Sequence, residues 1–125
     1  MTRCVSGYRP TVISARKLAA AHAAYYVVTG AWSVAHRASF ERVTGPKREY
    51  WLVRLVGGLA AATGASLGAA VLTGRRRPEA AVLALASSAA FVAADVHAAR
   101  AVSRVYLGDV VLHAVFLPAW IRRWR

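Results

Sequence analysis

Four apolar stretches, separated by short arginine-rich segments, constrain this chain more than any other feature. They cover residues 18–35, 51–73, 80–99 and 107–121. Because about 20 mainly apolar residues are enough for a helix to cross the hydrocarbon core of a bilayer, each stretch is close to the length of one crossing. The sequence therefore predicts one all-α domain over residues 1–125, an integral membrane four-helix bundle.

The composition argues against several other classes of protein. The chain has 125 residues, of which 58% are hydrophobic, and a net charge of +12, whereas a soluble domain is usually nearer half apolar and closer to neutral. The basic residues flank the apolar stretches, which is typical of membrane topology and of contact with anionic headgroups rather than of nucleic-acid binding. A single cysteine, Cys4, excludes an intramolecular disulfide and with it the disulfide-generating four-helix oxidoreductases. We expect the lipid bilayer of a cell (inner) membrane as the partner, and no nucleic acid.

Proline and glycine set the predicted helix bounds. Proline is tolerated in the first turn of a helix and glycine favours its end, so Gly45-Pro46 and Pro78 are interpreted as starts and Gly74 as a stop. Pro118 should loosen the last turn of the final helix, because it donates no hydrogen bond to a preceding carbonyl. The predicted helices are about 12–37, 46–73, 78–101 and 106–123.

The first apolar stretch also has the basic leader of a cleaved signal peptide. His22, Tyr25, Tyr26 and Trp32 are bulky for such a segment, so we expect a retained helix.

The positions of the basic residues predict the orientation of the chain. Ten of the 17 Lys and Arg residues lie in the N-terminal tail, in residues 75–77 and in residues 122–125, against six in the other two breaks. Because cytoplasmic segments carry the excess of Lys and Arg, both termini are predicted to be cytoplasmic.

The ionisable residues inside or next to the apolar stretches predict a polar site. An ionised side chain in hydrocarbon costs roughly 2.5–3.5 kcal/mol on insertion scales, so such groups usually face the bundle and pair. An ion pair of Arg54 with Asp95 or Asp109 is the expected contact. Helices of alternating direction bring nearly every acid and most histidines to the non-cytoplasmic face. The predicted buried polar cluster or ligand-binding site there consists of Arg54, Asp95, Asp109, His113, His36, Glu41 and Glu49.

The alternative to a functional site is a structural ion pair that holds the bundle together. Asp109 and His113 share one helical face, because they are four residues apart. With Asp95, His97 or His36 they have the residue types of a metal site, and an Asp that orients a His also suits proton transfer. A buried histidine satisfied by an aspartate one turn away is the more common arrangement. We therefore predict no metal, no cofactor and no catalytic residue.

Two stripes indicate how the helices pack. His22, Tyr25, Thr29, Trp32 and His36 recur at steps of three and four, so they line one face, which should point away from lipid. This face either forms hydrogen bonds between helices or lines a binding site for an apolar ligand with a polar head.

The second stripe is a strip of small residues, which predicts close helix packing within the bundle or between protomers, and hence a homo-oligomer as one option. Arg54 lies on the same face of the predicted helix as this strip. The strip consists of Gly57, Ala61, Gly64 and Gly68.

Aromatic residues near the helix ends are interpreted as interfacial anchors without a chemical role. They are Tyr8, Tyr50, Trp51, Tyr106, Trp120 and Trp124.

Two sequence segments carry a resemblance. Phe40-Glu41-Arg42-Val43-Thr44-Gly45-Pro46-Lys47 followed by Trp51-Leu52-Val53-Arg54, and Asp95-Val96 followed by Ala99-Arg100, Val105-Tyr106-Leu107 and Asp109, resemble small uncharacterised bacterial membrane proteins with four helices. The match covers roughly residues 18–120. The chain is also loosely similar to DoxX-type proteins in size and helix count. These resemblances imply a four-helix membrane fold and bring no reaction and no catalytic residues. Small multidrug transporters have similar length but need a glutamate in their first helix, which residues 12–37 lack.

The favoured function is a non-enzymatic accessory or small-ligand- or lipid-binding protein with a polar pocket at the non-cytoplasmic face. A small dimeric transporter or proton-coupled permease is the alternative, motivated by the strip of small residues. An intramembrane enzyme comes third, because no nucleophile with its base is recognisable.

Overall fold

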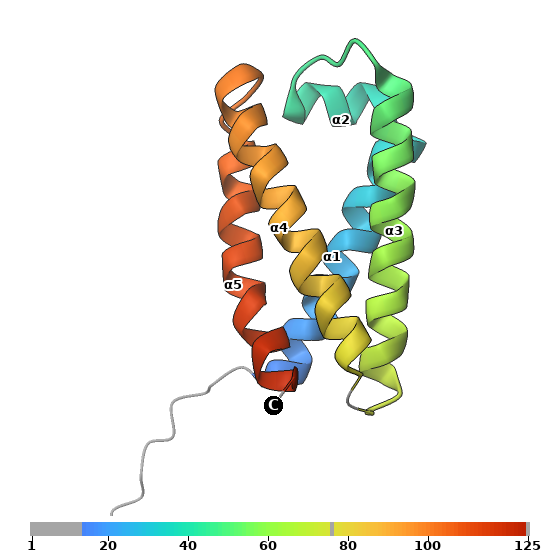
Figure 1. Cartoon of the computed structure of the whole chain (residues 1–125). Helices are drawn as coiled ribbons and strands as arrows, with labels where there is room; N and C mark the ends of the chain where they lie inside the picture. Colours follow the sequence, from blue (N-terminus) through green and yellow to red (C-terminus); the bar gives the residue numbers. More distant parts are fainter. Residues whose placement is uncertain (1–13, 76, 125) are drawn as a thin grey trace, which may run out of the picture.

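The computed structural model describes residues 14–75 and 77–124, and within them it is entirely helical. Of its five helices, the four long ones lie side by side and the short one lies across one end of them (Figure 1). The helices are α1 (Ala15–Ala35), α2 (Arg37–Thr44), α3 (Tyr50–Leu72), α4 (Pro78–Ala101) and α5 (Tyr106–Trp124).

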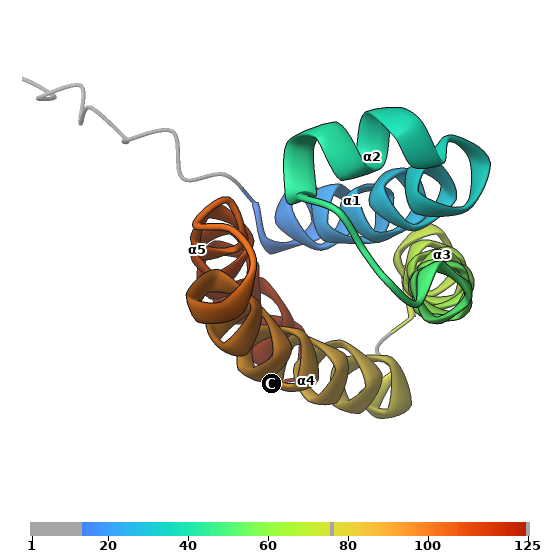
Figure 2. The same cartoon turned by 90° about the horizontal axis from the view of Figure 1, so that it is seen from above.

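The four long helices form a ring when they are viewed from above (Figure 2). In this ring α1 packs closely against α3, α4 packs against α5, and α1 also contacts α5. The start of α1 and the end of α5 lie at the same end of the bundle, opposite α2 (Figure 1). This arrangement matches the predicted up-and-down order of four helices.

Two of the helices, α3 and α4, are long and apolar enough to cross a membrane. The chain is thus a helical protein with two candidate membrane spans by length and composition. The other two long helices, α1 and α5, do not reach the same level of apolar composition. The polar stripe of α1 lowers the apolar content of this helix. The stripe faces inward, since His22 is buried and Tyr25, Thr29 and Trp32 are half-buried.

Two of the predicted helix ends, Gly74 and Pro78, are confirmed, and the start of α1 at Ser14 lies close to the predicted start at about residue 12. Ser14 caps α1, with its hydroxyl accepting a hydrogen bond from the backbone of Lys17. Gly74 follows the end of α3 with φ of 66°, a left-handed conformation that glycine adopts without strain. Pro78 opens α4, and Glu79 lies in its first turn, where a carboxylate favours the helix dipole.

The predicted break between the first two long helices is wrong in two respects. Residues 37–44 form the extra helix α2, and the next long helix begins at Tyr50 rather than at Pro46. Gly45 ends α2, with φ of 87° and its N–H bonded to the carbonyl of Glu41. The glycine is therefore a helix stop followed by proline, whereas the sequence analysis interpreted the same pair as a helix start.

The strip of small residues on α3 faces α1 in the same chain. A Cβ placed on Gly64 would lie 2.6 Å from the backbone oxygen of Ala23 and 2.8 Å from the backbone nitrogen of Val27. Gly57 meets Gly30 and Ser33 in the same way. The strip therefore allows the two backbones to touch, and the intrachain alternative is the one observed. An interface between copies of the chain stays a prediction.

Candidate functional site

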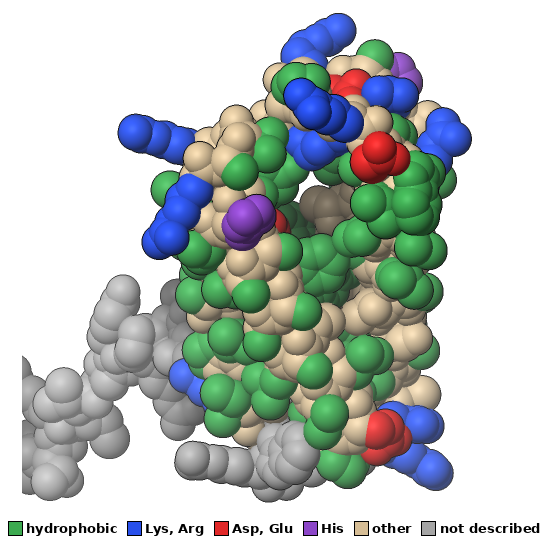
Figure 3. All heavy atoms as spheres, turned by 45° about the horizontal axis from the view of Figure 1, so that its top comes forward, with side chains coloured by type: hydrophobic (Ala, Val, Ile, Leu, Met, Phe, Trp, Pro, Cys, Tyr) green, Lys and Arg blue, Asp and Glu red, His purple; other side chains and the backbone are tan. Residues whose placement is uncertain are grey.

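A cavity of about 620 Å³ lies in the half of the bundle nearest α2. All five helices contribute to its lining, and its walls are mostly apolar. Figure 3 shows the surface hollowed below the charged end of the molecule, on a face that is otherwise rich in apolar side chains. Representative wall residues are Val43 of α2, Val56 of α3, Ala94 of α4 and Leu112 of α5.

The cavity opens sideways between α3 and α4. Leu52 and Val56 of α3 line it and are exposed, and so is Ala94 of α4. These two helices contact each other little compared with the other neighbouring pairs of long helices, so the space between them is not closed by packing. An apolar molecule can therefore enter from the side of the bundle rather than along its axis.

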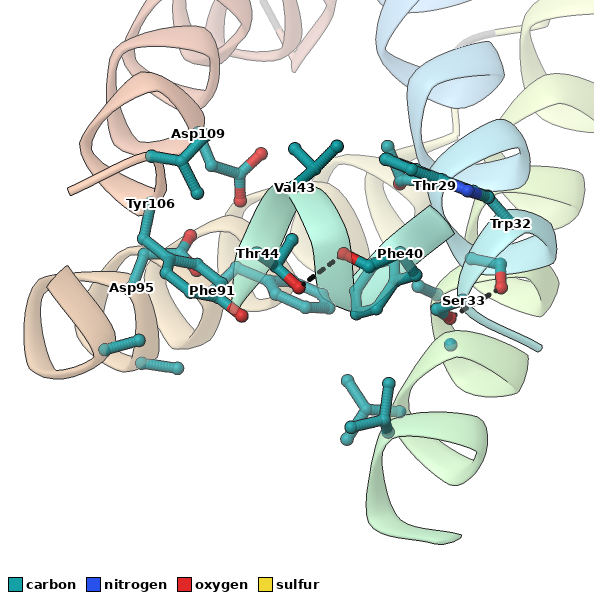
Figure 4. A pocket seen from close by; sticks show the side chains of 18 of the residues that line it. Thr29, Trp32, Ser33, Phe40, Val43, Thr44, Phe91, Asp95, Tyr106 and Asp109 are labelled. Carbon is teal, nitrogen blue, oxygen red and sulfur yellow. Dashed lines mark hydrogen bonds between the residues drawn. The ribbon is translucent and has the colours of Figure 1, made fainter. Parts of the chain in front are cut away.

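Helix α2 covers one end of the cavity, as the close-up in Figure 4 shows, with Phe40, Val43 and Thr44 over the space. Its position is fixed by His36, which ends α1 and caps α2, its Nδ1 accepting a hydrogen bond of 3.1 Å from the backbone of Ser39. Trp32 of α1 adds an indole N–H bond of 2.8 Å to the hydroxyl of the same serine.

The far end of α2 is held by Glu41. Its carboxylate pairs with Arg37 at 3.0 Å and accepts a hydrogen bond of 2.8 Å from the backbone N–H of Lys47. The hydrogen bond from Arg37, followed by that from Lys47, keeps the pKa of Glu41 below its usual range. The carboxylate thus stays ionised at neutral pH and fastens the segment between α2 and α3.

The polar end of the cavity consists of Asp95 on α4 with Asp109 and His113 on α5. One oxygen of each carboxylate and one ring nitrogen of His113 all lie within 4.8 Å of one another. Asp95 is 5% exposed and His113 is 1% exposed, while Asp109 is half-buried. Figure 4 shows Asp95 and Asp109 on the same side of the space, away from Trp32 and Ser33 of α1.

Hydrogen bonds from neighbouring helices orient this cluster. The Tyr25 hydroxyl on α1 donates to Oδ1 of Asp109, and Nδ1 of His113 lies 3.2 Å from the hydroxyl of Ser88 on α4. His113 Nε2 lies 3.5 Å from Oδ2 of Asp109. Oδ2 of Asp95 and Nε2 of His113 are buried and have no hydrogen-bond partner. The site thus contains a carboxylate oxygen and a ring nitrogen that form no hydrogen bond, next to an apolar cavity.

The structure brings together three of the seven predicted site residues and separates the other four. The predicted ion pair of Arg54 is wrong: its side chain is exposed, its guanidinium lies 5.8 Å from the centre of the Tyr50 ring, and it pairs with neither aspartate. His36 and Glu41 hold α2, as described above. Glu49 is exposed and accepts a hydrogen bond from the indole of Trp51.

Two serines that contact the cluster or a residue next to it were not predicted from the sequence. Ser87 and Ser88 are an isolated polar pair in the middle of an apolar helix, and this signal was available. Ser88 contacts His113, and Ser87 accepts a hydrogen bond of 3.1 Å from the hydroxyl of Tyr26.

Comparisons of the chain with family models, with curated proteins and with solved structures find no match. The resemblance to small four-helix bacterial membrane proteins therefore stays a prediction, and the function is argued from the site.

Proposed function

We propose that this chain is a multi-pass protein of the inner membrane, in which α1, α3, α4 and α5 all cross the bilayer. Large apolar side chains are exposed along the outer faces of the bundle, where a soluble protein would carry polar ones (Figure 3). Val111 of α5 is 61% exposed and Leu59 of α3 is 61% exposed, while the half-buried and buried polar groups of α1 and α5 point inward. At about 1.5 Å per residue, the 21 residues of α1 and the 19 of α5 span close to 30 Å.

The same proposal places both termini in the cytoplasm and α2 at the non-cytoplasmic face. The bias of Lys and Arg supports this orientation, and the start of α1 and the end of α5 lie at one end of the bundle, as termini on the same side of the membrane require. Helix α2 exposes Arg37 and Arg42 and turns Phe40 toward the bundle, which is typical of a helix that lies in the membrane interface.

The unique cysteine allows the orientation to be tested in the natural sequence. We expect Cys4 to react with a membrane-impermeant maleimide in inside-out vesicles and not in spheroplasts. An Arg42→Cys variant made in a Cys4→Ser background should give the opposite pattern, because α2 lies on the other side. Labelling of both positions from the same side would refute the four crossings.

Within the membrane, we propose that the protein binds a small amphipathic molecule. The observation that carries this function is the lateral cavity, whose walls are apolar and whose inner end is the cluster of Asp95, Asp109 and His113. Ligand-binding cavities of this volume are typically apolar with a few converging polar groups. The carboxylates and the imidazole suit a head group that donates hydrogen bonds. The apolar tail would lie between α3 and α4, facing lipid.

A cavity-filling variant tests this function. Ala94 lines the cavity, so Ala94→Trp should fill it, whereas Ala93→Trp, one residue earlier and outside the lining, adds the same side chain to the exposed face of α4. The probe is monoolein, a neutral lipid with two hydroxyl donors, detected by native mass spectrometry of protein released from detergent micelles. We expect Ala94→Trp to weaken binding by at least about tenfold, a change of about 1.4 kcal/mol.

The control Ala93→Trp should bind monoolein like the natural protein. Equal binding by the two variants would refute the cavity as the binding site. The alternative of a dimeric transporter gains no support from the strip of small residues, because α1 of the same chain occupies it.

A further inference from the structure

The cluster of Asp95, Asp109 and His113 has the composition and spacing of a metal-binding site. Each residue offers one ligand atom, and the three atoms lie within 4.8 Å of one another. A single cation bound by all three would draw these atoms to metal–ligand distances of about 2.0–2.2 Å. Two of the ligands come from one face of α5 and the third from the adjacent α4, so two packed helices hold the set.

Hydrogen bonds already prepare His113 and Asp109 for this role. The hydroxyl of Ser88 lies 3.2 Å from Nδ1 of His113 and can accept a hydrogen bond from it; in the tautomer that carries the ring proton on Nδ1, the lone pair of Nε2 is available to bind a metal ion. Tyr25 donates to Oδ1 of Asp109, which leaves Oδ2 on the side of His113. Metal-binding histidines and carboxylates usually have such supporting partners.

The two carboxylates of the cluster also favour the binding of a cation. Two carboxylates lie next to one imidazole, and in the part of the chain that the structure describes no Lys or Arg pairs with them. Oδ2 of Asp95 is buried without a hydrogen bond. A buried ionised carboxylate is stable when it is paired or binds a metal, and this requirement is stronger inside a membrane.

We propose that Asp95, Asp109 and His113 bind one divalent transition-metal ion, with Zn²⁺ as the first candidate. Oxygen and imidazole ligands suit Zn²⁺ and also Mn²⁺ and Fe²⁺. Three protein ligands leave at least one coordination position, and the cluster lies on the cavity wall, so this position is accessible from the cavity. The site does not depend on the identity of the amphipathic molecule proposed above.

Metal binding is measured on the full chain purified in dodecyl maltoside and stripped with a chelator. Equilibrium dialysis with Zn²⁺, read by elemental analysis, should give one ion per chain. Asp95→Asn and His113→Gln should each weaken binding by at least about 100-fold. His97→Gln should not change it, because His97 lies on the same helix as Asp95 but is exposed. Cobalt(II) in place of zinc should give a ligand-field absorption band that the two site variants remove.

Asp109→Asn is a further variant, since an asparagine oxygen still accepts the bond from Tyr25 and the fold is kept. Circular dichroism and gel filtration report whether each variant is folded. Binding of less than one ion per chain by the natural protein, or binding that Asp95→Asn and Asp109→Asn leave intact, overturns the metal site. Loss of monoolein binding in Ala94→Trp would still support the cavity, so the two proposals fail separately.

Discussion

A methyl group at Gly64 is expected to lower the free energy of unfolding by about 1–3 kcal/mol, because it forces the two most closely packed helices apart. In Gly64→Ala the new Cβ would lie 2.6 Å from the backbone oxygen of Ala23 and 2.8 Å from both Tyr26 Cβ and the backbone nitrogen of Val27. Two of these atoms belong to the backbone of α1, which has no rotamer to change. The helix must therefore move as a whole. Unfolding by SDS in mixed micelles, followed by circular dichroism, measures the loss.

Gly58→Ala is the matched control, since a Cβ at Gly58 meets nothing within 4 Å. Alanine has the higher helix propensity, so this variant should be unchanged or more stable by up to about 1 kcal/mol. The pair also separates the two uses of the strip. If Gly64→Ala lowered only the self-association of the chain and not the stability of the monomer, the packing of α1 against α3 would not be the role of the strip.

The long helices were largely predictable, because apolar length and the signals at Gly74 and Pro78 agree with the fold. The segment after α1 was not predictable in the same way. Gly45-Pro46 suits both the end of one helix and the beginning of another. The choice depends on the hydrogen bond from the backbone of Lys47 to Glu41, which forms only when the chain turns back after Gly45.

Only part of the candidate site was predicted from the sequence, for a related reason. Position along a membrane helix gives the depth of a residue but not the direction of its side chain. Asp95, Asp109 and His113 lie at a similar height along the bundle and point to the same space, whereas Arg54 lies on an exposed face of α3. If α3 crosses a bilayer as proposed above, an outward arginine near its end is tolerated, since the long side chain can extend to the interface.

Aromatic residues near helix ends also show that position along a helix does not give the direction of a side chain. Trp51 is exposed, as expected of an interfacial anchor, but Tyr50 and Trp120 are buried. The Tyr50 hydroxyl donates a hydrogen bond of 2.6 Å to the backbone oxygen of Ser33. Trp120 donates its indole N–H to Nδ1 of His22 at 2.9 Å. Both were interpreted as interfacial anchors from their position alone, but they pack inside the bundle, because a helix end inside a ring of four helices still has an inner face.

The contact of Trp120 with His22 is the second place where a large effect is expected. Trp120 is 2% exposed and His22 is completely buried, with its ring stacked on Phe116 at 4.8 Å between centroids. Nε2 of His22 has no partner, so the bond from Trp120 is the one hydrogen bond seen for this ring among the described residues. Trp120→Phe keeps an aromatic ring but removes the donor. It should therefore lower the free energy of unfolding by about 1–3 kcal/mol, the cost of an unsatisfied buried polar group.

Trp51→Phe is the control of the same chemistry on the surface. It removes an indole bond to Glu49, but both groups are exposed to solvent, so the stability should change by less than about 0.5 kcal/mol. A double-mutant cycle with His22→Leu isolates the contact, because in that background Trp120→Phe removes no hydrogen bond. We expect the cost of Trp120→Phe to shrink markedly there. An equal cost in both backgrounds would mean that Trp120 stabilises α1 against α5 by packing alone.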